Sequence, residues 1–239
     1  MGTTFLELTN KVIRKLNQVE LTSANFSSAT GFQALAKDLV QEAIDDINQA
    51  VTQWPFNHST GTITTVSGTQ TYSLASDNKV TDWKTFYLNE DASLEVSSKP
   101  LSVIEYLEWH NRLRANDQLA TAGSVNIPSQ IYRTRDLKIG VTPIPDRAYT
   151  ITYEYWKNPD RLSSATSTTL IPKEYDRVII AFAMQGAYDF RENYEMAAKE
   201  YQKYKKGLAD MKRTLVPQEI TYAYDTRARS RSRRDGWSK

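Results

Sequence analysis

Cysteine is absent from this sequence, and histidine occurs only twice, as His58 and His110. Without cysteine the chain can form no disulfide bond, no thiolate metal site and no cysteine nucleophile. Neither histidine has a second histidine or a suitable carboxylate at metal-ligand spacing. The sequence also lacks a glycine-rich phosphate loop, a nucleophile elbow and a zincin motif. We therefore expect no catalytic residue, no metal site, no cofactor and no enzymatic activity.

Long hydrophobic runs are missing as well. No segment approaches the roughly 20 apolar residues that a helix needs to cross a membrane. The N-terminal segment carries charges at short intervals, whereas a signal peptide has an uninterrupted apolar centre. Hydrophobic residues make up 40% of the chain and charged residues 24%, which is ordinary for a soluble globular protein. These features predict a soluble protein that has no membrane partner.

Two amphipathic helices are predicted near the N-terminus. Apolar residues recur at spacings of three and four over residues 5–19, and Thr4 with Glu7 has the pattern of a capping box. A broader apolar stripe with acidic flanks covers residues 31–54. Pro55 disfavours helical angles at the residue before it, so the second helix should end there.

A β-rich region is predicted over about residues 60–157, because the period of the apolar residues changes from about 3.6 to 2 after the second helix. Residues 62–66 and 69–74 are separated by a Ser-Gly pair, and we expect them to form a hairpin. The alternation is interrupted over residues 102–115, where a short helix is expected. An exposed loop should follow over residues 116–126.

Two further helices are predicted in the C-terminal part of the chain. They follow a serine- and threonine-rich linker, residues 163–169, and Pro172, which is well tolerated at the start of a helix. Apolar residues in the last helix have the three-and-four spacing of a coiled-coil seam. Such a seam must pack on another helix, either within the chain or in a neighbouring subunit. Its residues include Tyr194, Tyr201, Tyr204, Leu208 and Met211.

These elements together predict an α+β fold. We expect a four-helix bundle formed by the N- and C-terminal helices, with an inserted antiparallel β-rich region and an extended C-terminal arm. The expected divisions are N-terminal helices over residues 1–57, the β-rich insertion over 58–165, C-terminal helices over 166–215 and a basic arm over 216–239.

Positive charge is concentrated in this arm. From Asp225 to Lys239 the chain has six cations and two aspartates, although the net charge of the whole chain is only +2. Arginines interspersed with aromatic rings are typical of a docking peptide, since guanidinium groups pair with carboxylates and rings fill pockets. A free solvated tail and a nucleic-acid contact are the alternative interpretations. The candidate binding residues are Tyr222, Tyr224, Arg227, Arg229, Arg231, Arg233, Arg234 and Trp237.

Three segments resemble the head-to-tail adaptor proteins of short-tailed bacteriophages, the tail tubular protein A-like or gatekeeper group. The first is an acidic amphipathic helix that ends in Gln53-Trp54-Pro55-Phe56-Asn57. The second is Pro143-Ile144-Pro145-Asp146, followed by the strand from Tyr149 to Trp156. The third is Ile171-Pro172, which opens a helical pair. The resemblance covers about residues 32–213.

This resemblance implies a virion structural protein of the phage neck or tail, assembled in the cytoplasm of the bacterial host. Such adaptors form rings, usually dodecamers, around a channel for the genomic DNA, with the β region turned toward the tail. The implied partners are the portal protein, a tail nozzle protein, further copies of the same chain and the DNA that passes through the channel. Two other functions stay open: a DNA-binding module that uses the basic arm, and another neck component such as a head-completion protein.

The arm is our candidate for the contact with the portal, on its position and composition. We expect it to order only on a preformed portal, which costs roughly 2–5 kcal/mol and delays ring formation until a capsid is ready.

Overall fold

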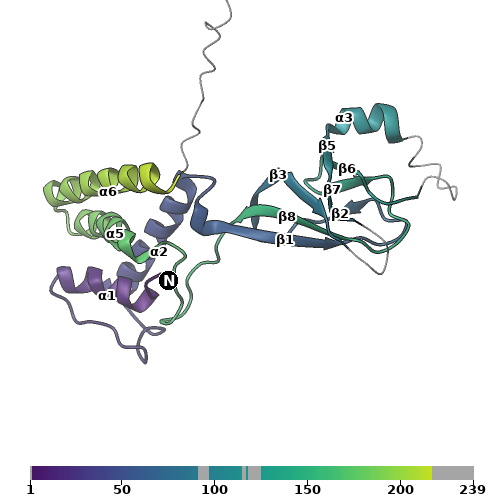
Figure 1. The fold of residues 1–239 in the computed structure, drawn as a ribbon. Coiled ribbons are helices and arrows are strands. Elements are labelled where there is room, and N and C mark those ends of the chain that lie inside the picture. Colours follow the sequence, from purple (N-terminus) through teal and green to yellow (C-terminus); the bar gives the residue numbers. More distant parts are fainter. Residues whose placement is uncertain (1, 91–96, 115–116, 118–124, 217–239) are drawn as a thin grey trace, which may run out of the picture.

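The computed structural model describes residues 2–90, 97–114, 117 and 125–216. It has two parts, which lie at opposite ends of an elongated molecule (Figure 1). Helices from both halves of the chain form one part, and the strands between them in the sequence form the other. Within the described residues, no helix combines the length and the apolar composition that crossing a membrane would require.

The helical part, as far as it is described, contains four α-helices and two 3-10 turns. Their bounds are α1 Phe5–Lys15, α2 Phe32–Ala50, α5 Asp176–Phe190 and α6 Tyr194–Leu215, with the turns η1 Pro55–Asn57 and η4 Lys173–Tyr175. Thr4 caps α1 by accepting a hydrogen bond from the Glu7 N–H at 3.3 Å, as the sequence pattern predicts. Both N-terminal helices are shorter than expected. Asn17 has a φ of 55° just beyond the end of α1, and Val51 is extended after α2.

The four helices do not form the expected four-helix bundle, so that prediction is wrong. α5 lies against α1, α2 and α6, whereas α6 packs mainly on α5. A four-helix bundle buries one stripe of each helix around a common axis. Here α5 is buried on several sides, because small residues let its neighbours approach closely. Gly186 of α5 lies against Leu39 of α2, and Gly207 of α6 lies against Val178 of α5.

The β part consists of two four-stranded sheets, with strand orders β1-β8-β3-β4 and β2-β7-β6-β5. The first sheet contains β1 His58–Thr64, β8 Thr150–Lys157, β3 Asn78–Leu88 and β4 Lys99–Pro100. The second contains β2 Thr71–Tyr72, β7 Ile139–Thr142, β6 Gln130–Arg133 and β5 Ser102–Ile104. Strands β1 and β8 run from the junction with the helical part into the β part (Figure 1).

Two predictions about strand pairing are wrong. β1 and β2 do not form a hairpin, because β1 pairs with β8 in one sheet and β2 pairs with β7 in the other. The loop between β1 and β2 therefore crosses between sheets, and the Gly68 N–H donates to the Pro145 carbonyl at 2.9 Å. The inserted region is also not wholly antiparallel, since β5 runs parallel to β6.

The segment after β5 is helical as expected, but only briefly. It comprises α3 Tyr106–Glu108 and a π-helical turn, η3 Trp109–Leu113. The indole ring of Trp109 stacks on Tyr132 of β6, with ring centroids 4.3 Å apart, which holds this turn on the second sheet. The loop predicted over residues 116–126 lies mostly outside the described residues. Its residue Asp117 is buried rather than exposed, and accepts hydrogen bonds from Trp109 and Gln70, each at 2.7 Å.

Candidate functional site

The junction between the two parts is built around the C-terminal end of α2. The last carbonyl groups of a helix have no partner within it, and they carry the negative end of the helix dipole. The indole N–H of Trp54 donates to the Ile47 carbonyl at 2.7 Å, and the Lys79 ammonium of β3 donates to the Asn48 carbonyl at 2.6 Å. Burial lowers the pKa of Lys79. The first sheet is thus tied directly to the end of α2.

The linker that follows β8 is also fastened to the helical part. The Leu162 N–H donates to the side-chain carbonyl of Gln41 at 2.9 Å, and Arg161 forms an ion pair with Asp45 at 3.2 Å. The N-terminal segment lies alongside the same linker. The Phe5 N–H donates to the Ser167 carbonyl at 2.8 Å. Contacts from three separate regions of the sequence therefore close the junction.

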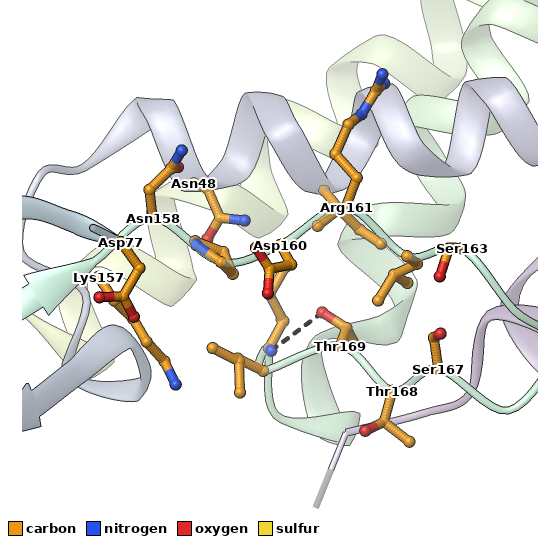
Figure 2. A pocket seen from close by; sticks show the side chains of 15 residues that line it. Asn48, Asp77, Lys157, Asn158, Asp160, Arg161, Ser163, Ser167, Thr168 and Thr169 are labelled. Atoms are coloured by element: carbon orange, nitrogen blue, oxygen red, sulfur yellow. Dashed lines mark hydrogen bonds between the residues drawn. The ribbon is translucent and has the colours of Figure 1, made fainter. Parts of the chain in front are cut away.

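A cleft of about 400 Å³ opens at this junction, between the end of α2, the end of β8 and the linker (Figure 2). Four charged residues of both signs contribute to its lining: Asp77, Lys157, Asp160 and Arg161. Asp77 accepts a hydrogen bond from the Tyr155 hydroxyl at 2.9 Å. The remaining polar lining includes amides and hydroxyls of the linker, where the Ile171 N–H donates to the Thr169 hydroxyl at 3.2 Å. Charged, amide and hydroxyl groups of this kind can bind a polar group through hydrogen bonds.

Neither histidine lines this cleft. His58 contacts Glu154 at 3.2 Å and packs edge-on against Trp156, and His110 lies 2.6 Å from a guanidinium nitrogen of Arg114. Across the part of the chain that the structure describes, no three histidine or acidic side chains gather in a way that could hold a metal ion.

The predicted seam of α6 divides between the core and the surface. Tyr204 and Met211 are buried in the helical part, and Leu208 is partly buried there. The Tyr204 hydroxyl donates to Asp46 of α2, and burial together with this carboxylate raises the pKa of Tyr204. Tyr194 and Tyr201 are instead 68% and 40% exposed. Part of the seam thus packs within the chain, and a contact between subunits stays a prediction for the two exposed tyrosines.

A second pocket, which the sequence did not indicate, lies between the end of α1, the start of α5 and the middle of α6. Its volume is about 320 Å³. Its lining includes four cations, Lys15, Arg177, Lys203 and Lys206, together with Glu200, Asp210 and the close approach of Gly207 to Val178. The three-residue spacing of Lys203 and Lys206 places both on one face of α6. Nothing local to the sequence shows that α1 and α5 add cations to the same face.

The predicted portal-binding residues all lie outside the described residues. They are Tyr222, Tyr224, Arg227, Arg229, Arg231, Arg233, Arg234 and Trp237.

Comparison with known proteins adds one match. A family model described as SU10 adaptor protein matches residues 3–234. No curated protein matches the chain. The family match extends beyond residues 32–213 at both ends, and it confirms the resemblance to phage head-to-tail adaptors.

Proposed function

The chain belongs to the SU10 adaptor protein family, whose role is that of a phage structural adaptor, and we propose that it forms the ring that joins the portal protein to the tail nozzle. The observation that carries this proposal is the family match over nearly the whole chain. An adaptor of this kind is a virion component that contacts other head and tail proteins. Its proposed role is to bind other proteins, so we propose no catalytic activity for it.

The two-part architecture supports a protein that contacts different partners at its two ends. Helices occupy one end of the molecule and the sheets occupy the other (Figure 1). The hydrogen bond from Lys79 of β3 to the Asn48 carbonyl at the end of α2 ties the two ends together. Direct bonds between the two parts suit a connector, because a force applied to the helical part must be transmitted to the β part.

In the proposed assembly, the helical parts of about twelve subunits stand side by side around the channel for the genomic DNA. The sheets point toward the tail nozzle. We propose that the arm, residues 216–239, grips the portal, on the strength of its arginines and aromatic side chains. Each subunit bound to the portal raises the effective concentration of the next, which favours completion of the ring.

Electron microscopy of the purified protein mixed with its portal tests this function, with native mass spectrometry of the protein alone as reference. We expect the protein alone to be a monomer and to form a ring on the portal. A variant that lacks residues 225–239 should keep its fold and lose attachment to portal-bearing heads. Wild-type attachment by this variant would refute the role of the arm.

A salt titration with duplex DNA distinguishes the nucleic-acid alternative. Tight binding by the monomer that falls steeply with salt, without any binding to the portal, would support a DNA-binding module instead.

A further inference from the structure

The basic pocket of the helical part is exposed and largely uncompensated. Among the described residues, Lys15, Arg177 and Lys206 form no ion pair, although Lys203 pairs with the buried Glu200 at 2.5 Å. All three unpaired side chains are exposed. The pocket is bounded by three helices whose relative positions are set by the core, so packing fixes the backbone from which its charged side chains extend.

A complementary surface lies on α2. Its four acidic residues occupy one stripe, since they recur at three- and four-residue intervals. Two of them have partners, because Asp45 pairs with Arg161 and Asp46 accepts from Tyr204. Asp38 and Glu42 are exposed, and neither forms an ion pair within the described ranges. We call Asp38 and Glu42, with their two partnered neighbours, the acidic stripe.

The two surfaces lie on different helices, the acidic stripe on α2 and the basic pocket between α1, α5 and α6. Tyr204 reaches Asp46, and so the acidic stripe of α2, whereas Lys206 lines the basic pocket. Residues two apart on a helix are separated by about 200°, so Lys206 points away from the Tyr204 side of α6. Among the described residues, no ion pair joins the basic pocket to the acidic stripe of the same subunit, so the unpaired charges of both are available to a neighbouring copy.

We propose that, in the ring of the proposed function on which this inference rests, the basic pocket of each subunit receives the acidic stripe of the next. The contact is heterologous, since two different surfaces of the same chain meet, and a contact of this kind closes into a ring when the rotation allows. Exposed ion pairs are individually weak, but the same contact recurs at every interface and sets the register between neighbours. Assembly should therefore weaken as the salt concentration rises.

A second copy is favoured over DNA as the occupant because the chain itself carries the matching surface. DNA would explain the basic pocket but not the exposed acidic stripe on α2. The two occupants also respond differently to charge reversal, because only a protein partner can be reversed to match.

Three charge-reversal variants test the proposal in the full chain, with ring formation on the portal as the readout. Arg177→Glu with Lys206→Glu reverses the pocket, Asp38→Lys with Glu42→Lys reverses the stripe, and the third variant carries all four changes. Lys84→Glu with Arg133→Glu is the matched control, since these two cations of the β part are exposed and form no ion pair within the described residues. Circular dichroism verifies that each variant is folded.

We expect each two-residue reversal to lower ring yield by about tenfold or more, and the control to assemble like the wild type. The four-residue variant should recover most of the ring. An equimolar mixture of the two-residue variants should also assemble, by alternating subunits.

Loss of the ring without recovery in the four-residue variant or the mixture would overturn the inference and leave the proposed function intact. Wild-type ring yield from either two-residue variant would overturn it as well. The same holds if the pocket variant still forms the ring and loses only binding to duplex DNA. Failure of the wild-type protein to form a ring on the portal would overturn the proposed function itself.

Discussion

Replacement of Trp54 tests whether the end of α2 is held in the way that the structure indicates. This side chain is fully buried, and its ring stacks on Phe56 with centroids 5.2 Å apart. Its N–H donates to the Ile47 carbonyl at 2.7 Å, which is one of the carbonyl groups without a partner inside the helix. Truncation to alanine removes a large core side chain and should cost about 3–5 kcal/mol.

Trp54→Phe separates the hydrogen bond from the burial. Phenylalanine keeps an aromatic ring but leaves the buried Ile47 carbonyl without its donor, which should cost about 1–3 kcal/mol. In a chain of this size 1 kcal/mol lowers Tm by roughly 2–4 °C. Urea unfolding and thermal unfolding, followed by far-ultraviolet circular dichroism, measure both quantities through the helical signal.

Trp83→Phe is the control for this experiment, at a tryptophan that is partly buried. Trp83 also stacks on a phenylalanine, Phe86, at 5.5 Å, but its indole N–H donates to no group in the described part of the chain. We expect a loss of less than about 1 kcal/mol for this variant, because only packing changes. If Trp54→Phe is as stable as the wild type, the hydrogen bond to Ile47 does not hold the end of α2, and this account of the junction is wrong.

Three further predictions concern the junction, the α6 contact and the β part. Lys79→Met removes the ammonium group that donates to the Asn48 carbonyl, and should lower the free energy of unfolding by about 1 kcal/mol; an unchanged urea midpoint would contradict this. Tyr204 has a pKa raised above its ordinary value of 10.0 by burial and by Asp46, so its contribution to stability is complete below pH 10 and is lost as the pH rises further. Urea midpoints measured from neutral pH to above pH 10 should therefore fall at the alkaline end, and less steeply for Tyr204→Phe than for the wild type. Asp117→Ala leaves the Trp109 and Gln70 donors without their acceptor, and should cost about 2–4 kcal/mol, measured as an earlier unfolding transition in tryptophan fluorescence.

The extent of the strands and the order of the elements were predictable because they depend on local patterns. Side chains that recur with a period of two predict strands over about residues 60–157, and the described strands run from His58 to Lys157. The Thr4 cap and the start of the C-terminal helices after Pro172 also depend on a few adjacent residues.

The partners of those strands were not predictable from the same patterns. Residues 62–66 and 69–74 have the composition of a hairpin, but β1 pairs with β8 across about ninety residues of sequence. A turn signal shows only that two strands are separated by a bend. It does not show whether a distant strand offers a better-packed partner, and here Gly61 leaves room for the ring of Tyr153 on β8.

The proposed binding surfaces also differ in whether the sequence could indicate them. The binding role of the arm was predicted from its arginines and aromatic residues and stays a prediction, and the family resemblance rested on short segments such as Trp54-Pro55-Phe56. The basic pocket combines Lys15, Arg177 and Lys206 from three helices, which are adjacent only because α5 packs against both α1 and α6.

The sequence by itself determined which segments are helices and which are strands, because backbone propensity and hydrophobic period act between residues that are close along the chain. Only the tertiary structure decided that α5 forms the centre of the helical part, that β1 joins β8, and that cations of three helices meet in the basic pocket. Those outcomes depend on burial and close approach between distant residues, and these are properties of the packed molecule as a whole.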